Sequence, residues 1–524
     1  YPLFSLLQQS VINEKTGEYT FEFFAKFVSK SYYYGSVINS IKVTVAVTVM
    51  TIIVATPLAY ILTTIKIKGA AGIRILILVS SMSAPFIGAY SWILLRGRNG
   101  AITNFTSDRF GVQMPSIDGF GGILLVLALQ FTPLIVMYIS GALKKGDSSL
   151  REASEGMGCT NFRKITKVVM PLITPTILAG ALLVFMRALA DFGTPMLLGE
   201  GFRTVPVLIF NEFMSEHGGD DSFAAAISVL VIIFATFVFL MQKFIAKRKA
   251  FAMSALKPIE CKKEKGIKNI LAHGYVYLYV CIAMLPQLCI IYTSFQKTAG
   301  LMFVPGYSLN SHVMAFSRMG DSIRNSFVFA LISIAIIVLL AILISYVTGR
   351  RPSAATNTLD TFTMFPYIVP GSILGIALLV AFNKPPIILA STATIIIVAF
   401  VIRRLPYTIR SSTAILHQVS PSVEEAAISL GASQMKTFFK ITVPMILSGV
   451  IAGAILSWIS ILTELSTSIL LYSAGTKTMS IETYTQVIRG NYGVAAALST
   501  IMSAATVISL LIFFKLTGKD EITL

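Results

Sequence analysis

The sequence predicts an all-α integral membrane protein built from two parallel repeats of six transmembrane helices. Its 524 residues are 55% hydrophobic and only 13% charged, with a mean hydropathy of +0.78, whereas an average soluble domain is roughly 25% charged. The apolar residues form runs of about 20 residues or more, long enough to cross a hydrocarbon core of ~30 Å as helices rather than as barrel strands. The two halves of the chain also resemble each other.

Eleven apolar runs are predicted to cross the membrane. They lie near residues 39–64, 72–95, 121–143, 171–192, 222–246, 271–292, 326–348, 359–382, 387–402, 444–471 and 494–516. A basic segment at residues 247–270 contains eight Lys or Arg and separates the fifth run from the sixth. We interpret it as a cytoplasmic linker between a first repeat, residues 1–246, and a second repeat, residues 271–524.

The internal repeat is detected at two fixed shifts. A shift of 273 residues pairs Ser149 with Ser422, Glu152 with Glu425, Ala153 with Ala426, Gly158 with Gly431, Pro171 with Pro444 and Gly180 with Gly453. A shift of 286 residues pairs Asn39-Ser40 with Asn325-Ser326, and Tyr60 with Tyr346. The first half therefore has 13 extra residues between these anchors, which we assign to its outer connection at residues 97–122.

The start of the chain suggests a twelfth helix. Residues 1–10 resemble residues 285–294, which close the first span of the second half. We therefore expect a matching helix to precede Tyr1, so that the intact protein has twelve transmembrane helices and this chain lacks the first or has it truncated.

The charge distribution sets the orientation. The formal net charge is +18, and basic residues, among them Arg403 and Arg404, are assigned to alternate connections, which the positive-inside rule places in the cytoplasm. This arrangement predicts a multi-pass membrane protein that contacts lipid and does not bind nucleic acid. The four cysteines show no metal-binding spacing and are expected to be inert thiols.

Two polar cytoplasmic segments, residues 149–171 and 422–444, repeat each other. Each begins with Ser-x-x-Glu, which predicts a capping box with Ser149 or Ser422 as N-cap. Gly158 and Gly431 are expected to end the short helix in a left-handed conformation, and Pro171 and Pro444 to open the next span. The alternative, that the glutamates are only caps and the glycines only turns, leaves the duplication unexplained.

The pattern Glu-Ala-Ala, three residues, Gly, nine residues, Ile-x-Leu-Pro resembles the signature of permease subunits of bacterial ATP-binding-cassette importers of type I. The second copy matches at Glu425, Ala426, Ala427, Gly431 and Pro444; the first matches at Glu152, Ala153, Gly158 and Pro171, with Ser154 in place of the second alanine. The resemblance implies that both segments are coupling helices for two copies of an ATP-binding subunit. It also implies a location in the bacterial cytoplasmic (inner) membrane and an extracytoplasmic substrate-binding protein as a partner.

The chain is not expected to be an enzyme. It contains no G-x-x-x-x-G-K-[ST] phosphate-binding loop, so no cofactor is predicted on this chain, and ATP with magnesium would be bound by the partner ATPase. Fused two-half permeases of the resembled family occur in the ferric-iron branch and in branches for thiamine and aminoalkylphosphonates. Residues 187–199 and 463–477 are most similar to the ferric-iron branch, and the other two substrates remain alternatives.

Two acidic residues are candidates for the substrate pathway. Asp191 and Glu464 are paired by the 273-residue shift, each twenty residues after its proline, or about 30 Å along a helix and so near the outer end of the span. Ferric iron is a hard cation that suits carboxylate ligands. Alternatively, Asp191 pairs with Arg187, and Glu464 caps a helix or meets headgroups. The sequence does not identify metal ligands.

Two other classes remain open. A secondary transporter of the major facilitator type also has twelve helices in two parallel halves, but residues 63–74 contain none of the acidic residues of that family's loop. A receptor or scaffold without transport leaves the duplication unexplained. A stable complex with an ATPase separates the first interpretation from both.

Overall fold

The structure is a computed structural model that describes residues 1–13, 16–81, 85–98, 100–113, 115–144, 153–154, 156–214, 221–248, 261 and 263–517. In this part of the chain, eight helices are long and apolar enough to cross a membrane, and two further helix pairs are bent by 97° and 109° at a short break. The predicted helical membrane fold is confirmed. Contacts divide the chain into two compact units: Tyr1–Phe23, Glu212–Val229 and Ile291–Asp520 form the first, and Phe24–Asn211, Leu230–Ile290 and Glu521–Leu524 the second.

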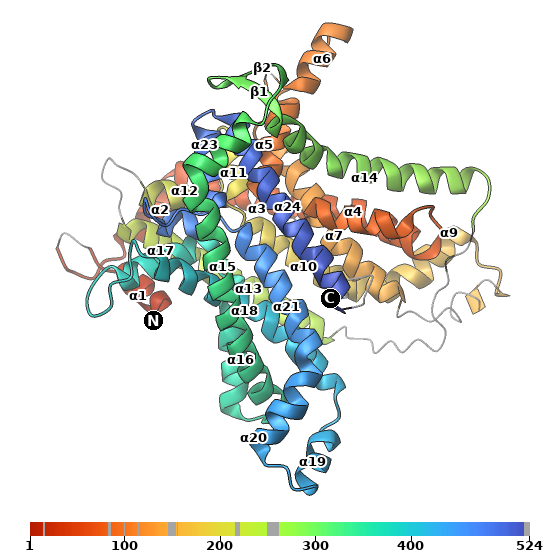
Figure 1. Cartoon of the computed structure of the whole chain (residues 1–524), viewed down its shortest axis with the longest axis vertical. Coiled ribbons are helices and arrows are strands. Elements are labelled where there is room, and N and C mark those ends of the chain that lie inside the picture. Colours follow the sequence, from red (N-terminus) through yellow and green to blue (C-terminus); the bar gives the residue numbers. More distant parts are fainter. Residues whose placement is uncertain are drawn as a thin grey trace. The chain divides into compact units, whose positions relative to one another are not determined.

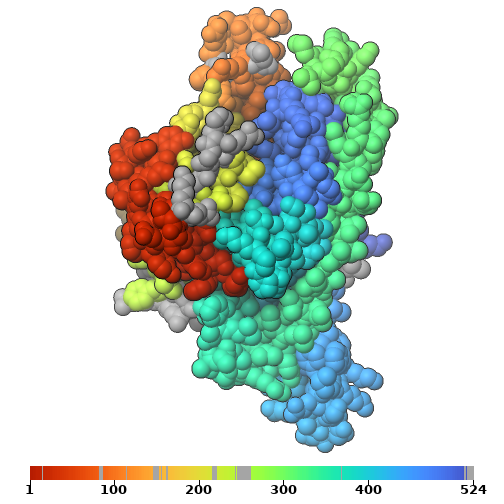
Figure 2. Space-filling view, turned by 90° about the vertical axis from the view of Figure 1, so that its left-hand side faces the viewer, coloured from red at the N-terminus to blue at the C-terminus, as the bar shows by residue number. Residues whose placement is uncertain are grey.

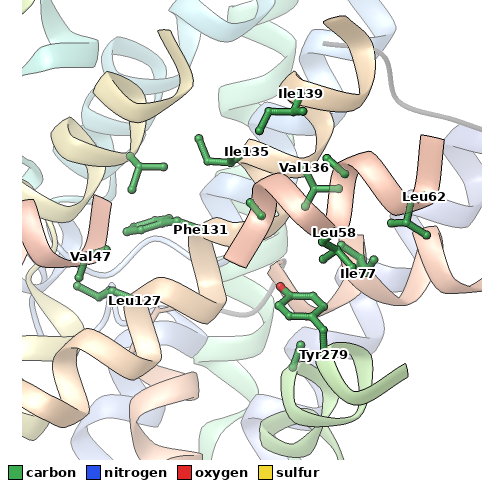
Figure 3. Close-up of a cluster of buried hydrophobic side chains, with 14 of the residues drawn as sticks. Val47, Leu58, Leu62, Ile77, Leu127, Phe131, Ile135, Val136, Ile139 and Tyr279 are labelled. Carbon is green, nitrogen blue, oxygen red and sulfur yellow. The ribbon is translucent and has the colours of Figure 1, made fainter. Parts of the chain in front are cut away.

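The second unit is built around α3 (Ser31–Thr64), α7 (Phe120–Lys144) and α10 (Met170–Leu189), which pack against one another. Figure 3 shows part of this apolar core, with Val47 of α3 beside Leu127 of α7, and Leu58 of α3 beside Ile77. The shorter helices α4 (Ala70–Ser81), α5 (Pro85–Arg96), α6 (Ala101–Phe110), α11 (Gly193–Leu198) and α12 (Val205–Phe213) complete the first repeat in this unit.

The first unit has the matching core. In it, α15 (Asn310–Arg350), α18 (Ala393–Gln418) and α21 (Val443–Leu462) pack against one another, and α24 (Tyr492–Thr517) packs on α15 and α21 (Figure 1). The other elements are α16 (Ala354–Ile368), α17 (Gly371–Phe382), α22 (Ser468–Leu471), α23 (Met479–Ile488) and the antiparallel hairpin of β1 (Gln296–Ala299) and β2 (Met302–Tyr307). Thus α15, α18 and α21 repeat the packing of α3, α7 and α10.

The sequence repeat extends to individual close contacts. A Cβ atom on Gly180 of α10 would lie 2.7 Å from Ile135 Cδ1 of α7, and one on Gly453 of α21 would lie 2.5 Å from Thr408 Cα of α18. Each of these residue pairs is related by the 273-residue shift. Glycine is required at Gly453 because a Cβ would meet backbone, whereas at Gly180 a Cβ would meet the movable end of a side chain.

The Asn-Ser pairs found by the 286-residue shift have the same role in both repeats. Asn39 Nδ2 donates to Arg203 O at 3.2 Å, and Ser40 Oγ accepts from Val205 N, the first residue of α12, at 2.8 Å. The second repeat matches: Asn325 Nδ2 donates to Lys477 O at 3.1 Å, and Ser326 Oγ accepts from Met479 N of α23 at 2.7 Å. Both pairs fix a loop to the start of a short helix.

The opening segments of the two repeats are exchanged between the units. Most of α14 (Ile267–Ser294) belongs to the second unit, where Tyr275 Oη donates to Val54 O at 2.9 Å and Tyr279 is buried against the core of Figure 3. Conversely, α1 (Pro2–Gln9) packs on α17 in the first unit, with the rings of Tyr1 and Phe382 5.9 Å apart. The compact units therefore do not follow the order of the sequence, and the repeat boundaries remain a prediction.

Several predicted span boundaries are wrong. Residues 72–95 and 359–382 do not form straight helices but the two bent pairs, and the second bend occurs at Pro370, between α16 and α17. The span predicted at 444–471 ends at Leu462, and its last residues form α22. The span predicted at 387–402 is not among the candidate spans of the described residues, and its helix, α18, begins at Ala393 and continues to Gln418.

Other connections contain structure that hydropathy does not predict. The 13 extra residues of the first half do fall where expected, because α5 and α7 are joined by residues 97–119 and α17 and α18 by only residues 383–392. The longer connection contains α6. Two further helices are α2 (Glu22–Ser29) and α13 (Asp221–Arg248), the latter continuing from the first unit into the second.

Candidate functional site

The second polar segment begins with α19 (Ser422–Ser429), a short helix at one end of the first unit (Figure 1). The predicted capping box is absent here: Pro421 is the N-cap residue, and no side chain caps the helix. Pro421 replaces Ser422 at the cap because its fixed φ suits the first turn. Glu424 and Glu425 both lie in the first turn, where the helix dipole favours negative charge.

Gly431 ends α19 as predicted. Its φ is +89°, a left-handed conformation that residues with a Cβ adopt only at a cost. The chain then starts α20 (Gln434–Thr437), with Ser433 Oγ accepting from Lys436 N at 3.3 Å as the N-cap. The glycine thus separates two helical pieces with different axes.

A π-helical turn joins α20 to the membrane span. This turn, η2 (Phe438–Thr442), ends where Val443 N donates five residues back to Phe438 O, and Pro444 follows in the first turn of α21. A proline ring clashes with the carbonyl four residues earlier, and a wider π turn moves that carbonyl away. We attribute η2 to Pro444 for this reason.

The first repeat has the same turn at the same place. Its turn, η1 (Ile165–Val169), lies 273 residues before η2, follows α9 (Asn161–Lys164) and runs into Pro171 at the start of α10. Gly158 has a φ of +77°, so the predicted helix stop is confirmed in this copy too. Ser149 and Glu152 lie outside the described residues, while Ala153 is exposed and Ser154 is buried.

The second segment exposes an apolar surface with one acidic group. Glu425 and Ala426 are exposed, and Ala427 is partly buried. Figure 2 shows this region as the blue tip of the first unit. The tip exposes five large apolar side chains: Val423 at 40%, Ile428 at 46%, Leu430 at 89%, Met435 at 66% and Phe439 at 61%.

Asp191 is placed beside a helix end. It follows α10 directly and is buried, and its Oδ1 accepts from Thr194 N at 3.0 Å in the first turn of α11. A carboxylate at this position satisfies a backbone donor that the helix leaves free. Asp191 is therefore at least a capping residue.

Glu464 has the same position in the other repeat. It is 3% exposed, and its carboxylate accepts from Thr467 N at 3.1 Å and from Ser468 N at 3.2 Å at the start of α22. The alternative in which Glu464 caps a helix is confirmed. Asp191 and Glu464 belong to different compact units, and a role in the substrate pathway stays a prediction for both.

Glu464 also has a cationic partner that the sequence did not reveal. Arg403 Nη1 lies 2.5 Å from Glu464 Oε1, and it also donates to Ser466 Oγ at 2.8 Å and Thr467 Oγ1 at 2.6 Å. The connection to which Arg403 and Arg404 were assigned is helical, because both residues lie inside α18. Arginine inside an apolar helix calls for an acidic partner, which is the signal that could have identified this pair.

Three further polar contacts were missed. Arg350, the last residue of α15, donates to Glu424 of α19. In α23, the buried Glu482 accepts from Gln486 Nε2 at 2.7 Å and lies 3.4 Å from Lys477 Nζ. No group of three or more His, Cys, Asp or Glu among the described residues is arranged to hold a metal ion.

Comparison with known proteins identifies the family. The model of the family "Binding-protein-dependent transport system inner membrane component" matches residues 28–251 and 341–518. The ferric transport system permease protein FbpB of Actinobacillus pleuropneumoniae is 28% identical over 463 residues, which cover 86% of this chain and 66% of that protein. A putative ferric transport system permease protein, FbpB 1 of Haemophilus influenzae, is 28% identical over 422 residues, covering 78% and 65%.

Other matches are shorter. A putative 2-aminoethylphosphonate transport system permease protein, PhnU of Salmonella typhimurium, is 23% identical over 252 residues, covering 47% of this chain and 87% of that protein. A chain of a bacterial ABC transporter involved in alginate import matches with a TM-score of 0.40 and 17% identity, covering 48% of this chain and 96% of that chain.

The chain spans about two thirds of the length of the two ferric permeases. The family model, by contrast, matches most of the chain and does so once in each repeat. The chain belongs to the family of inner membrane components of binding-protein-dependent transport systems.

Proposed function

We propose that the chain is the permease of an ATP-driven importer that takes up ferric iron and is driven by two separate ATPase subunits. One observation supports the coupling role above all. Both repeats place a glycine with positive φ, a π-helical turn and a proline-started span in the same order and register. A segment that only ends a helix does not need an equivalent copy in the other repeat. Two identical partner subunits do need two equivalent binding sites.

The second segment offers the surface that such a partner needs. Glu425 and Ala426 are exposed on α19, and Leu430 projects at its end. A helix with small exposed residues, a rim of apolar side chains and one carboxylate suits a cleft on another protein. We assign this surface to an ATPase subunit, and the equivalent segment around Ala153 and Gly158 to a second copy.

A displacement of α19 would be transmitted to the membrane span α21 through a short connecting segment. Residues Ala432 to Thr442 connect Gly431 to α21, whose N-terminal turn contains Pro444. The other end of α21 leads into the loop with Glu464. In this mechanism ATP, bound with magnesium by the partner subunits, supplies the work, and the permease converts it into alternating access.

Ferric iron is the proposed substrate because two relatives over most of the chain are named ferric transport permeases. An extracytoplasmic binding protein would deliver it, in accordance with the family description. Carboxylates suit this cation, and Asp191 and Glu464 are the proposed pathway residues. Neutralisation of Glu464 by Arg403 makes it the weaker candidate of the two.

The test is ATP hydrolysis by the permease reconstituted in lipid with its ATPase subunit and binding protein. Stimulation by the Fe(III)-loaded binding protein, but not by the empty one, is expected. Stimulation only with 2-aminoethylphosphonate or thiamine would reject iron and retain the importer. A permease that binds no ATPase subunit would reject the mechanism and favour a secondary transporter.

A further inference from the structure

Three residues in the last turns of α15 contact the stretch of chain that runs from the end of α18 to η2. Tyr346, Gly349 and Arg350 are spaced three and four residues apart, so they lie on one face of the helix. Each of them meets a different piece of the segment that runs from the end of α18 to η2. We call the surface formed by these three residues the α15 face.

Two of the contacts are packing contacts. The ring of Tyr346 lies 4.8 Å from that of Phe438, the first residue of η2, in an edge-to-face arrangement. A Cβ atom on Gly349 would lie 2.7 Å from Leu416 Cδ2, near the end of α18. Leu416 is fully buried and packs with Ile446 of α21. The α15 face thus touches both ends of the stretch from the end of α18 to η2.

The third contact is polar and is made with α19, in the middle of this stretch. Arg350 Nε donates to Glu424 Oε1 of α19 at 3.0 Å, and Arg350 Nη2 donates to Val419 O at 2.9 Å. The Arg350 and Glu424 side chains are only 10% and 12% exposed. Charge-assisted bonds shielded from water are stronger than exposed ones, and the planar guanidinium fixes two acceptors at once.

The adjacent glutamates therefore have different environments. Glu424 points to Arg350 and is largely buried, whereas its neighbour Glu425, about 100° further round the helix, is exposed. One glutamate holds α19 to the membrane domain, and the other remains available to a partner. The family motif contains only Glu425 and so gives no role to Glu424.

The ion pair belongs to the second repeat. The 286-residue shift places Thr64 of α3 opposite Arg350, and the Thr64 hydroxyl donates to its own helix, at Tyr60 O, 2.7 Å away. The residue opposite Glu424 is Arg151, which lies outside the described residues. A threonine hydroxyl cannot make the two simultaneous hydrogen bonds that the Arg350 guanidinium donates.

We infer that Arg350 is a positioning residue that fastens α19 to α15, so that a displacement of the coupling helix moves α15 as well as α21. The inference rests on the proposed coupling function. Without Arg350 the ATPase subunit still docks on the exposed tip, but α19 moves without α15, and ATP is hydrolysed with less transport.

The first experiment measures Fe(III) uptake per ATP hydrolysed in proteoliposomes that contain the permease, its ATPase subunit and the Fe(III)-loaded binding protein. Arg350→Gln is expected to lower this ratio about five-fold or more, the lower range of a typical coupling free energy, while ATP hydrolysis persists. The matched control is Arg351→Gln, whose exposed side chain makes, within the described part of the chain, only a 3.4 Å contact with Gln434 Oε1. An unchanged ratio in Arg350→Gln, or an equal loss in Arg351→Gln, overturns the inference.

Charge reversal tests the pair itself. Arg350→Glu or Glu424→Arg alone should lower the ratio, and the double variant should restore a large part of it. Glu424→Gln should act like Arg350→Gln, whereas Glu425→Gln should weaken binding of the ATPase subunit. A double variant no better than either single one contradicts a direct contact.

A second measurement needs no partner. Spin labels are placed at Val347→Cys and Ser429→Cys, both exposed sites, in a variant whose four native cysteines are replaced. A narrow distance distribution is expected, broadened by Arg350→Gln and unchanged by Arg351→Gln. If no ATPase subunit binds but Arg350→Gln broadens the distribution, the coupling function is wrong and the fastening is right. If the distribution does not broaden, the fastening is wrong whatever the ATPase does.

Discussion

Arg403 of α18 and Glu464 of the α21–α22 loop form an ion pair within the first unit, and the two side chains are only 15% and 2% exposed. The same carboxylate caps α22. One residue thus joins the end of a span to a neighbouring span and to the next helix. The pair explains why two charged groups are tolerated among apolar helices.

Removal of the cation should destabilise the protein strongly. Arg403→Gln leaves a buried carboxylate without its partner, a change that typically costs ~3–5 kcal/mol. Glu464→Gln is expected to cost less, because the amide oxygen still accepts from the end of α22. Thermal unfolding in detergent measures both, with Asp321→Asn as control, since the Arg324–Asp321 pair is exposed and should contribute almost nothing.

Gly371 should be intolerant of any side chain. A Cβ atom there would overlap Arg403 Nη1 and Ser466 Oγ. Gly371→Ala is therefore expected to displace the guanidinium and lower the unfolding temperature, whereas Gly320→Ala, in open space within α15, should be neutral or slightly stabilising. Equal unfolding temperatures for the two variants would contradict the close approach of α17 to Arg403.

Gly431 should be needed for its backbone conformation. An alanine at φ +89° is strained by about 1–2 kcal/mol, so Gly431→Ala should shift α19 and reduce ATP-dependent Fe(III) uptake. Nothing crowds the site, which means that the loss would come from the backbone alone. Uptake is compared with that of Gly320→Ala, in α15, which has neither positive φ nor close neighbours; equal uptake by the two variants counts against this explanation.

Pro444 should maintain the π turn. Pro444→Ala supplies the missing N–H and removes the ring, so η2 is expected to relax to an α-helix and rotate the preceding residues by about 100°. The variant should unfold at the same or a higher temperature and yet transport less Fe(III) per ATP. Pro57→Ala, in α3, removes a proline from a helix without a π turn and should keep wild-type transport. Full transport by Pro444→Ala would show that the π turn has no role in coupling.

Composition and periodicity predicted most of the architecture because hydrophobic length is a simple requirement of the bilayer. The repeat predicted equivalent positions as well: Gly180 and Gly453, and the pairs at Asn39 and Asn325, make matching contacts. The glycine stops at Gly158 and Gly431 followed from local backbone preference.

The errors have a common physical cause. Hydropathy does not detect a bend such as that at Pro370, because apolar residues continue through it. The apolar run that ends at residue 402 continues as the helix α18, in which Arg403 has Glu464 as its partner. Ion pairs such as Arg350–Glu424 join residues more than seventy positions apart, and no local pattern reveals them.

The measurement that tests the central claim most directly is ATP-dependent Fe(III) uptake into proteoliposomes by the wild-type complex and by a variant altered in both coupling segments. The variant combines Glu152→Arg and Gly158→Pro with Glu425→Arg and Gly431→Pro, and its presence in the membrane is verified. We predict that the wild type accumulates iron and that the variant does not. Uptake that survives all four changes would contradict the coupling role of these segments.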